Sequence, residues 1–123
     1  MNEFPRIDAV YRGTRVLRRS KSGHEYNAAH VTVNDKKLSN RYNEVSHSSD
    51  FEWGFLGSGP SQLAYAILRD FLGNRRKATL LHQAFKAEII LQLKQKSDWV
   101  LTGRQILNTI TVQESIVRDV QES

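Results

Sequence analysis

The chain has 123 residues, enough for one domain with its own core, and its 39% hydrophobic and 25% charged residues are typical of a globular protein. It contains no cysteine, which excludes a disulfide framework, a thiolate metal site and a cysteine nucleophile. The net charge is +5, and residues 1–41 carry the whole excess, with nine basic against four acidic groups, whereas residues 42–123 hold nine of each. This asymmetry bears on the partners of the protein and not on its fold.

Residues 6–56 predict mainly strands and loops. Apolar residues between Ile7 and Leu17 indicate one or two short strands separated by Gly13, and the polar run 18–23 predicts a mobile loop. Residues 30–33 alternate between polar and apolar side chains, and Asn34-Asp35 predicts a hairpin return.

The next segments lead from strands to helices. Residues 39–50 predict a loop, and residues 51–55 predict a last short strand with Phe51, Trp53 and Phe55 on one face. Pro60 follows a glycine-rich turn and suits the first turn of a helix.

Residues 60–122 predict mainly helices. The first should end at Gly73, and the second should run from about 75 to 95. Residues 99–101 are expected to be extended, and residues 102–105 form a capping box for a third helix. The β-branched run 109–112 predicts a kink or a short fourth helix.

These elements predict one domain, 1–123, of the α+β class. A small N-terminal antiparallel sheet of three or four strands should pack against a C-terminal helical hairpin and a third helix. The sheet is expected to meet two helical stripes, Leu63/Ile67/Phe71 and Leu81/Phe85/Ile89.

The run FEWGFLGSGPSQLA, residues 51–64, resembles the signature of an uncharacterised family, domain of unknown function 6166. Further matches in the same order lie at 11–13, 47–48, 83–86 and 99–102. The resemblance covers roughly residues 10 to 107. It implies a small protein of bacteria, archaea and their phages and plasmids, with no assigned activity. The basic stretch 18–21 and the tail after Ile110 lie outside the matching motifs.

The turn Gly57-Ser58-Gly59 opens a helix, where free N–H groups and the helix dipole favour an anion. It lacks the Lys-Ser/Thr ending of a P-loop and the spacing of a dinucleotide fingerprint. The alternative is a tight reversal that lets strand and helix pack closely, and we favour it.

A metal or acid–base cluster of His47, Asp50 and Glu52 is a weaker hypothesis. Metal ligation needs three or four convergent groups. The alternative interpretation is that these polar residues cap turns in a loop. We therefore expect no catalytic residue, no metal and no cofactor. Trp53 and its aromatic neighbours are interpreted as core and not as a stacking platform for bases.

The basic N-terminal third is the best candidate for a contact with nucleic acid or another partner. On a strand, Arg12 and Arg18 would share one face, and Arg15 and Arg19 the other. A solvated surface that only keeps the protein soluble would look the same. The candidate binding residues are Arg12, Arg15, Arg18, Arg19, Lys21, Lys36 and Lys37.

Three functions are compatible with these features. The leading hypothesis is a non-enzymatic binding module of a phage or plasmid that docks on nucleic acid or a nucleoprotein complex. The second is an inhibitor of a host defence protein, an anti-CRISPR-like counter-defence factor that acts by protein–protein binding. The third is a small enzyme that uses residues 47–58. With no secretory signal and no apolar run of about 20 residues, we expect a cytoplasmic protein without a membrane partner.

Overall fold

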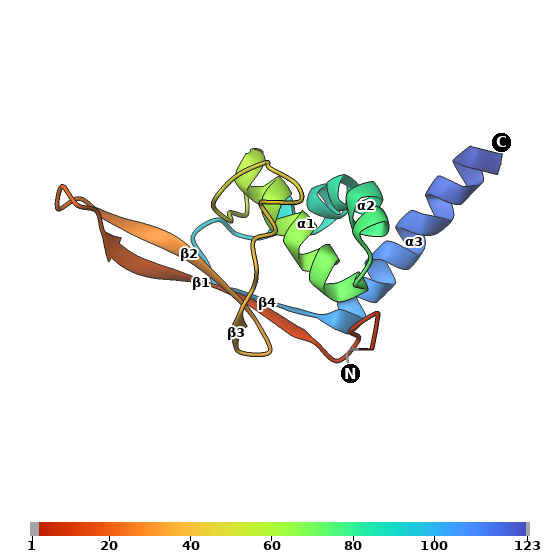
Figure 1. Cartoon of the computed structure of the whole chain (residues 1–123), viewed down its shortest axis with the longest axis horizontal. Helices are drawn as coiled ribbons and strands as arrows, with labels where there is room; N and C mark the ends of the chain where they lie inside the picture. The colour runs from red at the N-terminus through yellow and green to blue at the C-terminus, as the bar shows by residue number, and fades with distance from the viewer. Residues whose placement is uncertain (1–2, 123) are drawn as a thin grey trace.

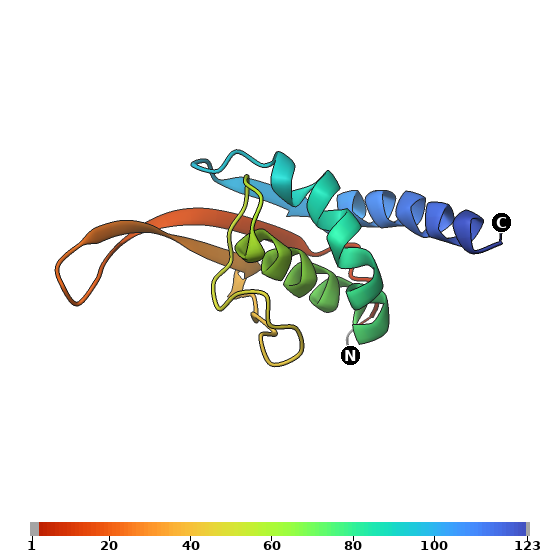
Figure 2. The same ribbon diagram turned by 90° about the horizontal axis from the view of Figure 1, so that it is seen from above.

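The computed structural model describes the backbone of residues 3–122 and the side chains up to residue 116. It confirms the α+β class. A four-stranded antiparallel sheet has the strand order β3-β2-β1-β4, and the helices pack on one of its faces (Figures 1 and 2). The elements in chain order are β1 (Val10–Arg19), β2 (Glu25–Val33), β3 (Lys36–Lys37), α1 (Ser58–Leu72), α2 (Arg75–Glu88), the 3-10 turn η1 (Ile90–Gln92), β4 (Trp99–Thr102) and α3 (Gly103–Glu122).

The predicted break at Gly13 is wrong, because β1 runs through it as one strand of ten residues. Gly13 lies opposite Trp99 of β4, and a β-carbon at Gly13 would overlap the Trp99 indole. The glycine therefore makes room for a tryptophan on the neighbouring strand, a use that sequence alone does not distinguish from a turn.

The hairpin return at Asn34-Asp35 is confirmed. Both residues have positive φ, 50° and 66°, as a type I′ turn requires. The Asn34 side chain also accepts a hydrogen bond from the backbone N–H of Val10 at 2.9 Å, which ties the turn to the start of β1.

The predicted loop 18–23 is shorter than expected. Arg18 and Arg19 still pair with Tyr26 and Glu25, so only residues 20–24 form the turn. The pairing of β1 with β4 ends at Gly13, and from there on β1 pairs with β2 alone among the described residues. The two strands therefore form a hairpin that projects from the body of the protein (Figures 1 and 2).

The predicted strand at 51–55 is wrong. Gly54 has φ 83° and donates a backbone hydrogen bond to Ile90 at 3.1 Å, so the chain bends there instead of extending. The bend buries Trp53 completely, whereas Phe55 remains 37% exposed. The Trp53 indole N–H reaches the carbonyls of Lys94 and Ser97, both at 3.2 Å.

The helices follow the sequence more closely. Pro60 lies in the first turn of α1, and Gly73 ends it with φ 63°. The second helix is shorter than predicted, since α2 ends at Glu88 and η1 follows. The capping box is confirmed by the hydrogen bonds between Thr102 and Gln105, and α3 continues unbroken through residues 109–112.

The core lies between the helices and the inner face of the sheet. We call inner the face that carries the buried side chains of Tyr11, Val31, Val33 and Leu101. Both predicted helical stripes are buried against the core, except that Ile89 is only partly buried.

Candidate nucleic-acid interface

In the part of the chain that the structure describes, the helices leave the opposite face of the sheet uncovered, and we call it the outer face (Figures 1 and 2). The strand register places Lys37, Thr32, Arg12 and Val100 in one row across it, and Tyr26 beside Arg18 in a row near the hairpin tip. The side chains of this face come from alternate positions of each strand. They are Val10, Arg12, Thr14, Val16, Arg18, Tyr26, Ala28, His30, Thr32, Lys37, Val100 and Thr102.

The outer face carries cations and no carboxylate among the described strand residues. Arg12, Arg18 and Lys37 are exposed, and none of them has an ion-pair partner within the part of the chain that the structure describes. Tyr26 is 47% exposed and Val100 is 53% exposed on the same face. The structure thus brings together three of the seven basic residues that the sequence singles out.

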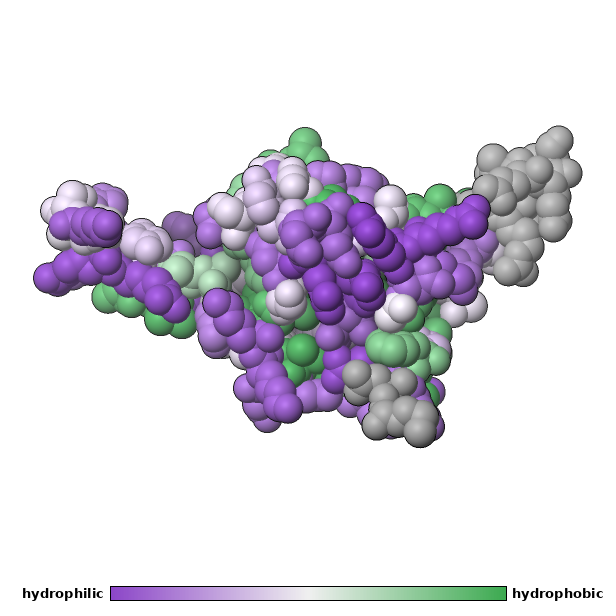
Figure 3. Space-filling view, in the orientation of Figure 1, coloured by the Kyte–Doolittle hydropathy of each residue, from purple (hydrophilic) through white to green (hydrophobic). Residues whose placement is uncertain are grey.

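The other basic candidates are distributed differently. Lys21 is exposed in the turn at the hairpin tip. Arg19 lies on the inner-face side of the hairpin, where it forms an exposed ion pair with Glu25 at 2.8 Å. Lys36 is exposed opposite Val33, and so it does not share the face of Lys37. Figure 3 shows hydrophilic residues covering the end of the hairpin, with a hydrophobic strip beside them.

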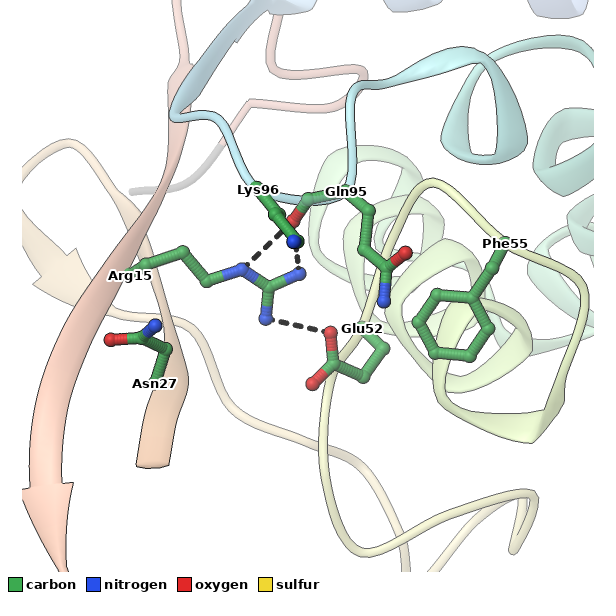
Figure 4. Close-up of a pocket in the computed structure, with 6 residues that line it drawn as sticks. All are labelled: Arg15, Asn27, Glu52, Phe55, Gln95 and Lys96. Carbon is green, nitrogen blue, oxygen red and sulfur yellow. Dashed lines mark hydrogen bonds and ion pairs between the residues drawn. The ribbon is translucent and has the colours of Figure 1, made fainter. Parts of the chain in front are cut away.

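Arg15 does not belong to this surface. Its side chain is only 13% exposed, binds Glu52 at 2.7 Å and donates to the Gln95 carbonyl at 2.6 and 3.0 Å (Figure 4). Its guanidinium carbon lies 3.9 Å from the centroid of the Trp53 ring. Arg15 therefore joins the sheet to two loops, and three of its five guanidinium N–H groups already donate to these partners.

An open depression of about 350 Å³ surrounds Arg15. It is lined by Arg15, Asn27, Glu52, Phe55, Gln95 and Lys96 (Figure 4). Because the charges of Arg15 and Glu52 already satisfy each other, the depression offers Lys96 as its remaining cation.

The glycine-rich turn is closely packed. Gly57 precedes α1, and Gly59 is buried with the Glu52 side chain against it, so that a β-carbon at Gly59 would lie 2.7 Å from the β-carbon of Glu52. This contact supports the packing interpretation of the glycines. The anion site at Gly57, Ser58 and Gly59 stays a prediction.

The structure brings His47 next to His82, a pair that the sequence spacing did not indicate. Their Nε2 atoms are 3.0 Å apart. The Nδ1 of His82 faces the carbonyl of Thr79 at 2.8 Å and must donate to it, so its Nε2 accepts from His47. Burial lowers the pKa of the His82 imidazole, and the neighbouring His47 lowers it further.

His47, Asp50 and Glu52 do not converge on one point. Glu52 is committed to Arg15, and Asp50 lies exposed in the loop. Among the described residues, no group of three or more His, Asp or Glu side chains is placed to hold a metal ion.

The loop that carries His47 is held by polar contacts with α1. The buried Gln62 accepts from the backbone N–H of His47 at 2.9 Å and donates to the Asn40 carbonyl at 2.9 Å. Glu44 accepts from Tyr65 and Arg69, each at 3.1 Å. Residues 40–47 are thus fixed beside the sheet edge without forming regular structure.

In the described part of the chain, no helix combines the length and hydrophobicity that crossing a bilayer requires. Residues 11–112 match a family of unknown function, DUF6166. No curated protein and no solved structure gives a significant match.

Proposed function

The chain belongs to the DUF6166 family, whose function is unknown, and we propose from the structure that it is a non-enzymatic module that binds nucleic acid through the outer face of its sheet and the projecting hairpin. The observation that carries the proposal is the set of cations Arg12, Arg18 and Lys37, which have no ion-pair partner among the described residues and lie on a face to which the described strands contribute no carboxylate. The setting we propose is a mobile element, with the nucleic acid bare or in a nucleoprotein complex in the cytoplasm.

The distribution of the acidic residues supports binding over mere solubility. The strands carry one acidic residue, Glu25, and it lies on the inner-face side of the hairpin, where it pairs with Arg19. A surface that only needs hydration tolerates both signs of charge, whereas a phosphate-binding surface disfavours carboxylates.

The uncharged side chains of the outer face suit the same partner. Thr14, Thr32 and His30 supply hydrogen-bonding groups between the cations, and hydroxyl and imidazole groups bind phosphate and sugar oxygens. Tyr26 lies beside Arg18 and is half exposed, so its ring is free to stack on a base. The hairpin carries this pair away from the body, where a polymer can reach it (Figure 1).

Fluorescence anisotropy with labelled duplex DNA, single-stranded DNA and RNA at about 50 and 200 mM salt tests the proposal. We expect binding at low salt that weakens steeply at high salt. A triple variant, Arg12→Ala/Arg18→Ala/Lys37→Ala, should reduce the salt slope for duplex DNA by about 0.9 for each phosphate contact that is lost.

A matched control removes the same charge elsewhere. Lys36→Ala/Arg75→Ala/Arg76→Ala takes three exposed cations from outside the outer face. Equal weakening by both triple variants would show that only net charge matters, and absence of binding at about 50 mM salt would refute the proposal.

A protein partner is the second candidate function, and it includes the inhibitor of a host defence protein. The edge of β2 favours it: β3 pairs with Thr32 and Val33, and the rest of that edge has no neighbouring strand among the described residues. Unpaired backbone groups at a sheet edge are the usual docking point for another chain. Capture experiments with candidate defence proteins test it, and failure of every such pair to associate would count against it.

A further inference from the structure

The edge strand β2 is covered by β3 over only a short distance. The β3 strand pairs with Val33 and Thr32, and the last bond of this ladder runs from the Leu38 N–H to the Val31 carbonyl at 3.0 Å. The backbone N–H and C=O groups of successive strand residues point to opposite edges of the strand, so every second residue faces the same edge. The N–H and C=O groups of Ala29 and Asn27 therefore face the same edge as those of Val31.

A second contact confirms this alternation. Ser20 N–H donates to the His24 carbonyl at 2.8 Å across the hairpin, so the even-numbered residues bond between β1 and β2. The odd-numbered Asn27 and Ala29 are left outside that ladder. Within the described residues, no hydrogen bond reaches the backbone N–H or C=O of either one. Four backbone groups are therefore free along this edge.

A groove follows the same edge. Two adjoining hollows of about 590 and 400 Å³ lie between β2 and the loop that follows β3, and both are lined by Ala29, Lys37, Leu38, Asp50 and Phe51. The small side chain of Ala29 leaves the groove open next to the half-buried ring of Phe51. The loop is held in place by its contacts with Gln62, so the second wall of the groove is already formed.

We propose that this groove binds an extended, acidic segment of a partner protein as an added strand of the sheet. The partner backbone pairs with Asn27 and Ala29 and continues the line of β3. Its residue opposite Ala29 points to the inner side and meets Phe51, which suits an apolar side chain.

The charges beside the groove select the acidic partner. The alternate residues of the added strand point to the outer face, where Lys37 and Arg18 line the groove and have no ion-pair partner among the described residues. Two carboxylates line the same hollow, but Glu52 is bound to Arg15, so Asp50 is left to offset the two cations. Glutamate or aspartate at those positions neutralises them. A second copy of this chain fits poorly, since pairing the same edges would bring both sets of Arg18 and Lys37 onto one face.

The test uses a synthetic eight-residue peptide in which glutamate and valine alternate. Titration of the isotope-labelled protein, followed by amide NMR and hydrogen exchange, should shift and protect the Asn27 and Ala29 amides. A peptide in which lysine replaces glutamate should bind at least about tenfold more weakly.

Two proline variants separate strand addition from simple attraction between charges. Ala29→Pro removes a donor that faces the open edge, a position where proline is tolerated, and should weaken binding of the acidic peptide at least about tenfold. The matched control is Leu17→Pro, which removes a donor from the open edge of β1. The Arg15 N–H donates to Asp98 on that side of β1, and the N–H of Leu17, two residues later, faces the same side. If Ala29→Pro does not fold, Asn27→Pro replaces it.

Specific outcomes would overturn the proposal. They are the absence of amide shifts with the acidic peptide, equal effects of Ala29→Pro and Leu17→Pro, and equal binding of the acidic and basic peptides. Protection of both amides in the free protein, with a dimer in sedimentation velocity, would assign the edge to a second copy instead.

Discussion

Arg15 of β1 lies over the ring of Trp53 in the loop before α1, with its guanidinium carbon 3.9 Å from the ring centroid. The same guanidinium binds Glu52 and the carbonyl of Gln95, which lies between η1 and β4. One cation therefore connects the sheet to two segments that are far apart in the sequence (Figure 4). This role differs from that of the exposed cations on the outer face.

Replacement of Arg15 by alanine should lower the free energy of unfolding by about 1–3 kcal/mol, because it removes the stacking on Trp53 and leaves Glu52 without its partner. Urea unfolding followed by tryptophan fluorescence measures the loss. Arg18→Ala, which removes an exposed cation of the same strand, is the control and should change the stability by less than about 0.5 kcal/mol. A larger loss for Arg18→Ala than for Arg15→Ala would contradict the assignment.

Replacement of Gly13 by alanine should displace Trp99 and cost about 1–3 kcal/mol. Trp99 packs edge-on against Trp53 with ring centroids 5.6 Å apart, so the change should also appear in the near-ultraviolet circular dichroism. Gly23→Ala serves as the comparison, since it has free space around it and only the strain of φ 87°. An unchanged near-ultraviolet spectrum in Gly13→Ala would show that the two indoles are not coupled in this way.

The sequence predicts most of the fold because its local signals agree with the packing. Pro60, Gly73 and the Thr102–Gln105 capping box place helix ends correctly, since each acts within one helical turn. The errors at Gly13 and at 51–55 have a common cause. In both, a residue far away in the chain, Trp99 or Ile90, decides the local conformation.

The candidate site was only partly predictable for the same reason. Strand alternation correctly separates Arg12 and Arg18 from Arg15 and Arg19, but it does not show that Arg15 is committed to Glu52. The free edge of β2 depends on how early β3 ends, and the two lysines of β3 carry no signal for that.

Tyr11 and Arg6 share one carboxylate oxygen of Asp70, each at 2.6 Å, which links the N-terminal segment and β1 to α1. Burial raises the pKa of the Tyr11 hydroxyl far above its ordinary value, and the Asp70 carboxylate raises it further. The folded state therefore keeps this proton at a pH where the unfolded chain loses it. The stabilisation is complete below about pH 10 and declines as the pH rises above it.

The free energy of unfolding of Tyr11→Phe should consequently fall less steeply above about pH 10 than that of the parent protein. Urea unfolding between pH 8 and 11 provides the comparison. Tyr42→Phe changes an exposed tyrosine and should leave the alkaline decrease as it is. If Tyr11→Phe and the parent protein lose stability in parallel, the Tyr11–Asp70 contact does not govern this range.

The contact between His47 and His82 predicts a loss of stability in acid. The folded state holds His82 neutral, because burial and His47 lower the pKa of its ring below the ordinary value of about 6.5. An unfolded chain thus binds a proton more readily than the folded one. The stabilisation is complete above about pH 6.5 and is lost as the pH falls through the folded-state pKa of His82.

His82→Asn should reduce this acid dependence, although it also lowers the stability at neutral pH by removing the bond to Thr79. Unfolding by urea at several values between pH 8 and 5 measures both effects. His24→Asn changes the exposed histidine of the hairpin turn and is the matched control. Protonation of His82 places a cation against the His47 ring and near the Lys86 ammonium, so the loop that carries His47 should separate from α2 first. Amide exchange in residues 40–47 should therefore accelerate in acid before global unfolding, and equal acceleration in His82→Asn would place the trigger elsewhere.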